Sequence, residues 1–186
     1  MKVIKFGGSS LASATQLEKV LNIVKSDPER RFVVVSAPGK RNDGDTKVTD
    51  ALIKYYKHYT KGADVKADQE WIINRYQAIV DELGFKSKEM VNIAKAITDL
   101  ATLPIEDNDF LYDTFLAAGE NNNAKLIAAY FNQNGLEARY VHPREAGIVV
   151  TSEPGNARII PSSYDKIEEL TNSNEVLVIP GFFGVT

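Results

Sequence analysis

The chain has 186 residues, of which 44% are hydrophobic and 25% charged, a composition that suits one α/β domain with a full core. It has no cysteine and two histidines, which excludes disulfides, thiolate nucleophiles and zinc–cysteine sites and argues against a multi-histidine metal site. The net charge of -3, without a basic stripe, gives no case for nucleic acid, and no apolar run reaches the roughly 20 residues of a membrane span.

The start of the chain predicts a strand, a helix and a second strand. Residues 2–6 are a short apolar strand, and residues 32–37 are a continuous apolar strand of the kind found in parallel sheets. Between them, apolar residues recur at i, i+3, i+4 and i+7, which predicts a helix with one buried face. Thr15 has the spacing to a later glutamate that a capping box requires, so we expect it to cap this helix.

Lys5 ends the first strand directly before Gly7, Gly8 and Ser9. An ammonium group in a buried strand is costly unless an anion meets it, and paired glycines let a ligand approach the backbone closely. The pattern therefore favours a phosphate site between the strand and the helix. The alternatives are a plain tight turn at the glycines and a lysine at the surface.

The middle of the chain is helical. Residues 38–48 are polar and rich in turn residues, which predicts a mobile loop. A helix follows, and two more amphipathic helices make up a helical insertion at about residues 64–104 that carries no polar constellation. Residues 108–135 predict a longer helix with a Gly-Glu pair inside it, where glycine costs up to about 1 kcal/mol relative to alanine.

The last part of the chain predicts a strand at residues 137–141, a hairpin at 147–160, a helix that Ser162 or Ser163 can cap, and a buried strand within 175–184. Strands that alternate with helices predict a mostly parallel central sheet with right-handed crossovers. The fold class that we expect is α/β, a three-layer αβα sandwich.

Ligands of such sheets bind beyond the carboxyl ends of the strands. Four segments end a strand or could face that edge, namely KFGGSS, VSAPGKRNDGDTKVTD, AAGE and PGFFG. The common nucleotide motifs are absent, since no G-x-G-x-x-G follows the first strand and no G-x-x-x-x-G-K-[ST] occurs. The convergence of the four segments predicts a ligand site of another type.

In kind and order these segments resemble the aspartokinase family, within the amino-acid kinase fold. The resemblance spans essentially the whole chain. GFFG and Phe6 favour aspartokinases over relatives that act on glutamate, acetylglutamate or uridylate, and SAPGKR followed by KVTD resembles the Gram-positive branch. The resemblance implies ATP-dependent phosphorylation of the β-carboxylate of L-aspartate, the first step of lysine, threonine and methionine biosynthesis.

The same resemblance implies ATP and Mg²⁺ as cofactors, L-aspartate as partner, no nucleic acid or membrane partner, a cytoplasmic location and a homo-oligomer in the full-length enzyme. It also implies residue roles. Lys5 would be the catalytic lysine that neutralises charge on the transferred phosphoryl group. Gly7, Gly8 and Ser9 would hold the ATP phosphates through backbone N–H groups. No residue is assigned to a metal.

For the substrate, the resemblance implies that Ser36 and Thr49 contact aspartate, that Glu120 receives its ammonium group and that Phe182 packs over it. Two of these residues have plainer alternatives, because Glu120 could be a solvated helix residue and Thr49 a helix cap. The family usually has a serine three residues before the glutamate. This chain has Ala117 there, so the affinity for substrate could differ.

In the family, the segment that corresponds to PGFFG is followed by a nucleotide lobe and usually by a pair of ACT domains. We therefore expect residues 1–186 to be the amino-terminal lobe of an amino-acid kinase domain, truncated at the C-terminus, inactive by itself and prone to self-association through an exposed sheet edge. The alternatives left open are the kinase half of a fusion with homoserine dehydrogenase, a sibling kinase for another amino acid, a non-catalytic ligand-binding module and, with least support, an oxidoreductase.

Overall fold

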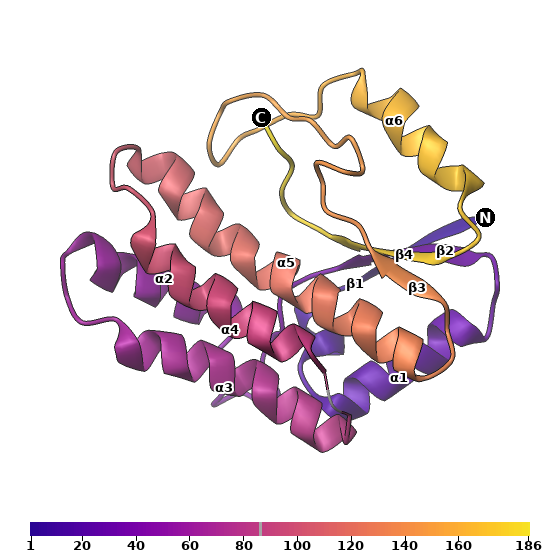
Figure 1. Cartoon of the computed structure of the whole chain (residues 1–186), viewed down its shortest axis with the longest axis horizontal. Coiled ribbons are helices and arrows are strands. Elements are labelled where there is room, and N and C mark those ends of the chain that lie inside the picture. The colour runs from indigo at the N-terminus through magenta and orange to yellow at the C-terminus, as the bar shows by residue number, and fades with distance from the viewer. Residues whose placement is uncertain (86) are drawn as a thin grey trace.

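A parallel sheet forms the centre of the protein in a computed structural model that describes residues 1–85 and 87–186. Its described strands are β1 (Lys2–Phe6), β2 (Arg30–Val35), β3 (Ala138–Tyr140) and β4 (Val176–Pro180). They lie in the order β1-β2-β4-β3, and every neighbouring pair is parallel (Figure 1). Crossovers between parallel strands need helices, and these supply the other layers.

The helices lie on both faces of the sheet, which confirms the predicted three-layer fold (Figure 1). Those on the first face are η1 (Gly8–Leu11), α1 (Ala14–Lys25), α2 (Val48–Thr60), α3 (Lys66–Leu83), α4 (Glu89–Asp99), η2 (Leu100–Thr102) and α5 (Asn108–Gln133). On the second face lie α6 (Ser163–Glu169) and η3 (Leu170–Asn172), together with the C-terminal loops. No described helix is both long enough and apolar enough to cross a membrane.

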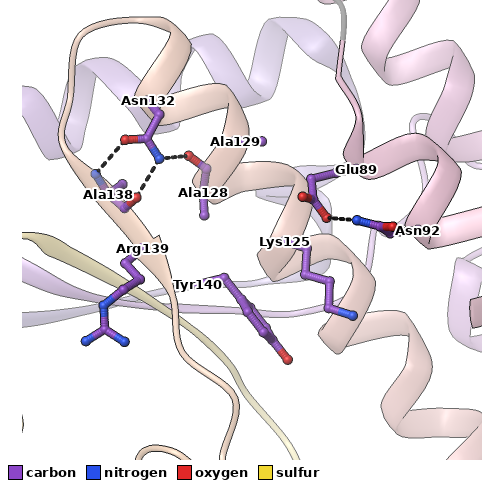
Figure 2. Close-up of a pocket in the computed structure, with 9 residues that line it drawn as sticks. All are labelled: Glu89, Asn92, Lys125, Ala128, Ala129, Asn132, Ala138, Arg139 and Tyr140. Atoms are coloured by element: carbon purple, nitrogen blue, oxygen red, sulfur yellow. Dashed lines mark hydrogen bonds between the residues drawn. The ribbon is translucent and has the colours of Figure 1, made fainter.

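The two edges of the sheet differ. β1 is an edge strand with one open face, where Val3 is 66% exposed and Lys5 is exposed as well. Our expectation of a buried lysine is therefore wrong, because alternate side chains of an edge strand can face water. At the other edge, the side-chain amide of Asn132 bonds to both the N–H and the carbonyl of Ala138 in β3 (Figure 2). This contact satisfies two backbone groups that would otherwise be open to another strand.

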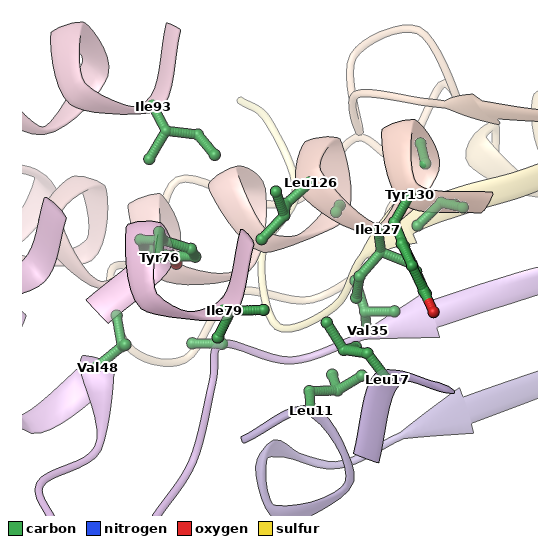
Figure 3. Packing of buried hydrophobic residues seen from close by; sticks show 14 of the residues in the cluster. Leu11, Leu17, Val35, Val48, Tyr76, Ile79, Ile93, Leu126, Ile127 and Tyr130 are labelled. Carbon is green, nitrogen blue, oxygen red and sulfur yellow. The ribbon is translucent and has the colours of Figure 1, made fainter. Parts of the chain in front are cut away.

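The core lies between the sheet and the helices of the first face. Its centre is α5, which contacts α2 and α4 on one side and β2, β3 and β4 on the other. Figure 3 shows Ile127 of α5 next to Val35 of β2, while Leu126 lies toward Tyr76 and Ile93 of the outer helices. Because α5 is covered by the sheet on one side and by the outer helices on the other, apolar residues such as Phe115, Leu126 and Phe131 are fully buried on it.

Two local predictions at the C-terminal end are settled by hydrogen bonds. The predicted hairpin is confirmed by an antiparallel bridge between Val150 and Ile159. The helix α6 begins at Ser163, close to where we expected it, but its N-cap makes no side-chain cap bond. Instead, Ser163 Oγ donates to the carbonyl of Val149 at 3.1 Å and accepts from its N–H at 2.9 Å. This serine therefore ties α6 to the hairpin.

The start of α1 differs from the prediction. Its N-cap is Ser13, whose Oγ accepts a hydrogen bond from the backbone N–H of Gln16 at 3.4 Å. Thr15 lies inside the first turn, so the capping box that we expected there is wrong. Ser13 and Gln16 have the same capping-box spacing. The short helix η1 ends at Leu11, two residues before Ser13.

The cap assignment predicts that Ser13→Ala lowers the free energy of unfolding by about 1 kcal/mol, because an N–H group in the first turn of α1 loses its acceptor. Thr15→Ala is the matched control and should change this free energy by less than about 0.5 kcal/mol, since it removes no cap. Urea unfolding of the 186-residue chain measures both values. A larger loss for Thr15→Ala than for Ser13→Ala would contradict the assignment.

Candidate functional site

The turns that follow β1 and β2 touch each other through two glycines. The N–H of Gly39 donates to the carbonyl of Gly8 at 2.8 Å. A Cβ atom at Gly39 would lie 2.5 Å from the carbonyl carbon of Gly8, and one at Gly8 would lie 3.0 Å from the carbonyl oxygen of Ala37. Neither glycine has a positive φ angle. Glycine is needed here for the close approach of two backbones and not for backbone freedom.

The first of these turns gathers a cation and backbone donors. Gly7 is the N-cap of η1, so the N–H groups of Gly8 and Ser9 lie in its first turn, where a helix offers no acceptor. Lys5 lies beside them, since a Cβ atom at Gly7 would be 3.7 Å from its Nζ. The structure therefore brings together the four residues that we expected at a phosphate site. An ammonium group beside backbone N–H groups is a set that suits an anion.

Glu120 lies next to these turns on α5. It is 8% exposed, and its Oε2 is buried with no hydrogen-bond partner among the described residues. Burial raises the pKa of Glu120, while the backbone N–H of Ala37 and the charge of Lys5 act to lower it. The alternative of a solvated helix residue is therefore wrong. A buried carboxylate with one unpartnered oxygen is typical of a site that receives a cation.

Contacts on both sides of Glu120 hold α5 in place. A Cβ atom at Gly119 would lie 2.8 Å from Cβ of Ala37, so only glycine lets the helix come this close to the loop after β2. Nδ2 of Asn123 donates to the carbonyl of Ser36 at 2.7 Å. On the opposite side, the hydroxyl of Tyr76 donates to the carbonyl of Gly119 at 2.8 Å. The glycine that weakens the helix locally is thus explained by packing at the site.

Ser36 and Thr49 lie at the two ends of the same loop. Ser36 directly follows β2 and is half-buried, and its N–H donates to the carbonyl of Phe6 at 3.3 Å. Thr49 lies in the first turn of α2, whose N-cap is Lys47 without a side-chain cap bond. The alternative that Thr49 caps α2 is therefore wrong.

Phe182 follows β4 in the third turn at the carboxyl edge of the sheet. Its φ angle is 78°, and its side chain is 74% exposed. A non-glycine residue in this left-handed region costs of order 1–3 kcal/mol, and a ring in water gives no packing energy in return. The N–H of Gly181 donates to the carbonyl of Val35 at 2.9 Å, which places the start of this turn beside the end of β2.

Sequence reasoning missed Arg75 on α3. Its side chain is buried, and its Nη2 donates to the carbonyls of Ala12 at 2.6 Å and Gly39 at 3.1 Å. The same nitrogen lies 3.6 Å from Oδ2 of Asp45. This oxygen accepts from Nε of Arg41 at 2.7 Å, and Oδ1 of Asp45 accepts from Nη2 of Arg41 at 2.9 Å. The Arg41 guanidinium holds the pKa of Asp45 well below its usual range.

These ion pairs correct two expectations. The loop at residues 38–48, which we expected to be mobile, is fastened to α3, and the helical insertion at about 64–104 does carry a polar constellation. A signal was present in the sequence. Arg75 comes three residues after Ile72 and four before Ile79, and both isoleucines are fully buried. An arginine on the apolar face of a helix requires buried acceptors, and that spacing could have revealed it.

A groove of about 380 Å³ lies elsewhere, between α4, α5 and the free edge of β3 (Figure 2). Its charged groups have neighbours within the protein. Nε of Arg139 pairs with Glu175 at 3.0 Å, Glu89 accepts from Asn92 at 3.1 Å, and Nζ of Lys125 lies 5.5 Å from the centre of the Tyr140 ring. We place no site there. Among the described residues, no group of three or more His, Cys, Asp or Glu side chains could hold a metal ion.

The whole chain, residues 1–186, matches the model of the amino acid kinase family. It is 46% identical over 184 residues to aspartokinase 3 of Bacillus subtilis, and 29% identical over 199 residues to the chloroplastic aspartokinase 2 of Arabidopsis thaliana. These matches cover 99% and 98% of this chain but 40% and 35% of the relatives. The chain thus spans well under half of their length.

Solved structures of similar shape are also aspartokinases. The crystal structure of Clostridium acetobutylicum aspartate kinase has a TM-score of 0.79 at 32% identity, covering 98% of this chain and 39% of the other. Aspartokinase III of E. coli, solved in complex with aspartate and ADP, has a TM-score of 0.77 at 22% identity, with coverages of 98% and 40%. At that lower identity the likeness concerns the fold alone.

The burial of Glu120 predicts how stability depends on pH. Glu120→Gln should raise the free energy of unfolding of the ligand-free chain by about 1 kcal/mol at pH 7, because it removes a charge that burial disfavours. The pKa of Glu120 is higher in the folded state than in the unfolded state, so protonation restores the lost stability to the wild type. The advantage of the variant should therefore shrink as the pH falls toward about 4.

Urea unfolding between pH 4 and 8 measures this difference. Glu18→Gln is the control, because it changes an exposed glutamate of α1 and removes no buried charge, so it should not raise the free energy of unfolding at pH 7 as Glu120→Gln does. If Glu120→Gln were less stable than the wild type at pH 7, the carboxylate would be a structural group and not an unpartnered binding group.

Proposed function

This chain belongs to the amino acid kinase family, and we propose that it forms the phosphate turn and the amino-acid pocket of an aspartokinase. The observation that carries the proposal is the buried oxygen of Glu120, which has no hydrogen-bond partner among the described residues and is influenced by the charge of the exposed Lys5. A buried carboxylate suits the ammonium group of an amino acid. The lysine and the N–H groups of η1 suit the phosphates of a nucleotide. Similarity to aspartokinases supports aspartate as the amino acid.

In the proposed reaction, a β-carboxylate oxygen of L-aspartate attacks the γ-phosphorus of ATP. The bond from this phosphorus to the β,γ-bridging oxygen breaks, and 4-phospho-L-aspartate and ADP form. Lys5 balances the negative charge that spreads over the transferred oxygens, while Gly7, Gly8 and Ser9 present the turn that holds the phosphates. Glu120 holds the ammonium group of the substrate and so orients its carboxylate. Mg²⁺ would enter on the nucleotide, and we assign no residue of this chain to it.

Three further residues complete the proposed pocket. The hydroxyl groups of Ser36 and Thr49 contact aspartate from the loop after β2 and from the start of α2. Phe182 packs over it, and its strained, exposed conformation is one that a binding site retains when a ligand is to cover the ring. Ala117, one turn before the glutamate on α5, leaves this pocket one hydroxyl group short of the usual family pattern.

We further propose that the 186-residue chain has no turnover by itself. Lys5 is exposed and Phe182 is 74% exposed, so the described site is open to water. Phosphoryl transfer depends on a site that excludes water and strengthens its electrostatic contacts. The role in lysine, threonine and methionine biosynthesis, the cytoplasmic location and the homo-oligomer remain proposals that rest on the family.

Trapping of the acyl phosphate with hydroxylamine tests the reaction in the protein expressed from its whole coding sequence. We expect product with aspartate and MgATP and none with glutamate. Lys5→Met should lower kcat by about 100-fold or more, because it removes a group that acts in the transition state. Lys19→Met, which changes an exposed lysine of α1, should keep the wild-type rate. Product with glutamate alone would indicate a sibling kinase, and no product with either would indicate a binding module.

The role of Glu120 predicts a selective loss of affinity. Glu120→Gln should raise the Kd for aspartate by about 10- to 100-fold, the range of one charge-assisted hydrogen bond, and leave the Kd for ATP within about twofold. Isothermal titration calorimetry measures both constants. Equal losses for both ligands would indicate a structural role, and an unchanged Kd for aspartate would remove Glu120 from the pocket.

A further inference from the structure

Arg75 joins two turns that belong to different crossovers. Ala12, which accepts from its Nη2 at 2.6 Å, is the C-cap of η1 after β1. Gly39, which accepts from the same nitrogen at 3.1 Å, lies in the loop after β2. The arginine itself is 63 and 36 residues away along the chain, on α3. One guanidinium group therefore links the turns from outside both of them.

Stability alone does not explain a guanidinium group at this place. Arg75 is 4% exposed, burial lowers its pKa, and its Nε has no hydrogen-bond partner among the described residues. The neighbouring carboxylate of Asp45 is 3.6 Å away and is shared with Arg41. Apolar side chains often replace buried ion pairs without loss of stability. The two carbonyl contacts of Arg75 are therefore considered for the turns that they hold together.

The two turns carry the groups of the proposed site. The turn after β1 presents the N–H groups of Gly8 and Ser9, and the loop after β2 presents the N–H of Ala37 to Glu120. Between them lies the bond from the N–H of Gly39 to Gly8. Arg75 holds the carbonyl of the same residue, Gly39. A shift of Gly39 would therefore change the distance between the turn after β1 and the carboxylate of Glu120.

We propose that Arg75 is a positioning residue that fixes the phosphate turn relative to the loop facing Glu120, and thereby couples the binding of the nucleotide to the binding of the amino acid. It touches neither ligand. The positioning stands on the contacts above, whereas the coupling rests on the proposed function. The next residue, Tyr76, holds the carbonyl of Gly119 at 2.8 Å, so the same turn of α3 also fixes the helix that carries the glutamate.

Amide hydrogen exchange of the 186-residue chain, followed by NMR, tests the positioning without any ligand. In Arg75→Met, the protection of the Gly39 amide should fall at least tenfold more than that of Val33, a core amide in β2. Arg31→Met is the matched control. Arg31 lies at the amino end of β2, away from the turns, and also donates to two backbone carbonyls, those of Thr171 and Ser173. Removal of its guanidinium group should therefore lower the protection of the Gly39 amide no more than that of the Val33 amide.

Equal losses of amide protection at Gly39 and Val33 in Arg75→Met would overturn the positioning role of Arg75. Should that variant fail to fold, Arg75→Lys decides, because its ammonium group can reach one of the two carbonyls. We expect a smaller but still selective loss at Gly39. Unchanged exchange at this amide in Arg75→Lys would likewise overturn the positioning.

Coupling is tested in the protein expressed from its whole coding sequence. The Kd for the ATP analogue adenylyl-imidodiphosphate with Mg²⁺ is measured with and without saturating L-aspartate. The ratio of the two constants should differ from one in the wild type, come within about twofold of one in Arg75→Met, and be partly restored in Arg75→Lys. A ratio unchanged by Arg75→Met would overturn the coupling. If the wild type bound neither ligand, the proposed function and the coupling would both fail, and hydrogen exchange would still decide the positioning.

Discussion

The contact between Gly8 and Gly39 is the constraint on which the site depends. Two parallel strands end side by side, and their turns can meet only because neither carries a side chain at the meeting point. Gly119 meets the same need on α5, where it lets the helix approach Ala37. Three backbone segments thus come close together because Gly8, Gly39 and Gly119 carry no side chain. This is why a carboxylate on a helix, Glu120, lies within reach of the N–H of Ala37 in the turn after β2 and is influenced by the charge of Lys5 at the end of β1.

The two charged groups of the candidate site, Lys5 and Glu120, differ in their exposure to water. Lys5 is exposed on the open face of β1, whereas Glu120 is buried with one oxygen unpartnered. Burial raises the pKa of the glutamate, and the lysine acts against this shift from a distance. A bound ammonium group would act in the same direction as the lysine and more strongly, because it would meet the carboxylate directly. Ligand binding and the protonation state of the glutamate are therefore linked in the proposed function.

The outer helices take part in the site as well as in the core. From adjacent positions on α3, Arg75 and Tyr76 reach the glycine turns and the carbonyl of Gly119. The apolar face of the same helix packs on the core through Ile72 and Ile79. Arg75 and Tyr76 lie between these two isoleucines at helical spacing, so one buried face of α3 carries both the apolar contacts to the core and the polar contacts to the site. The layer that covers α5 therefore also sets the spacing of the groups around the glutamate.

Periodicity and glycine positions act over a few residues. For this reason the sequence was enough to predict the types of element and their order, the long helix at residues 108–135 and the close turn at Gly7 and Gly8. It did not show that β1 is an edge strand on which Lys5 is exposed, or that Ser13 and not Thr15 caps α1. Nor did it show the role of Arg75, whose acceptors lie 63 and 36 residues away. Such contacts depend on which elements become neighbours in space, and only the packed tertiary structure decides that.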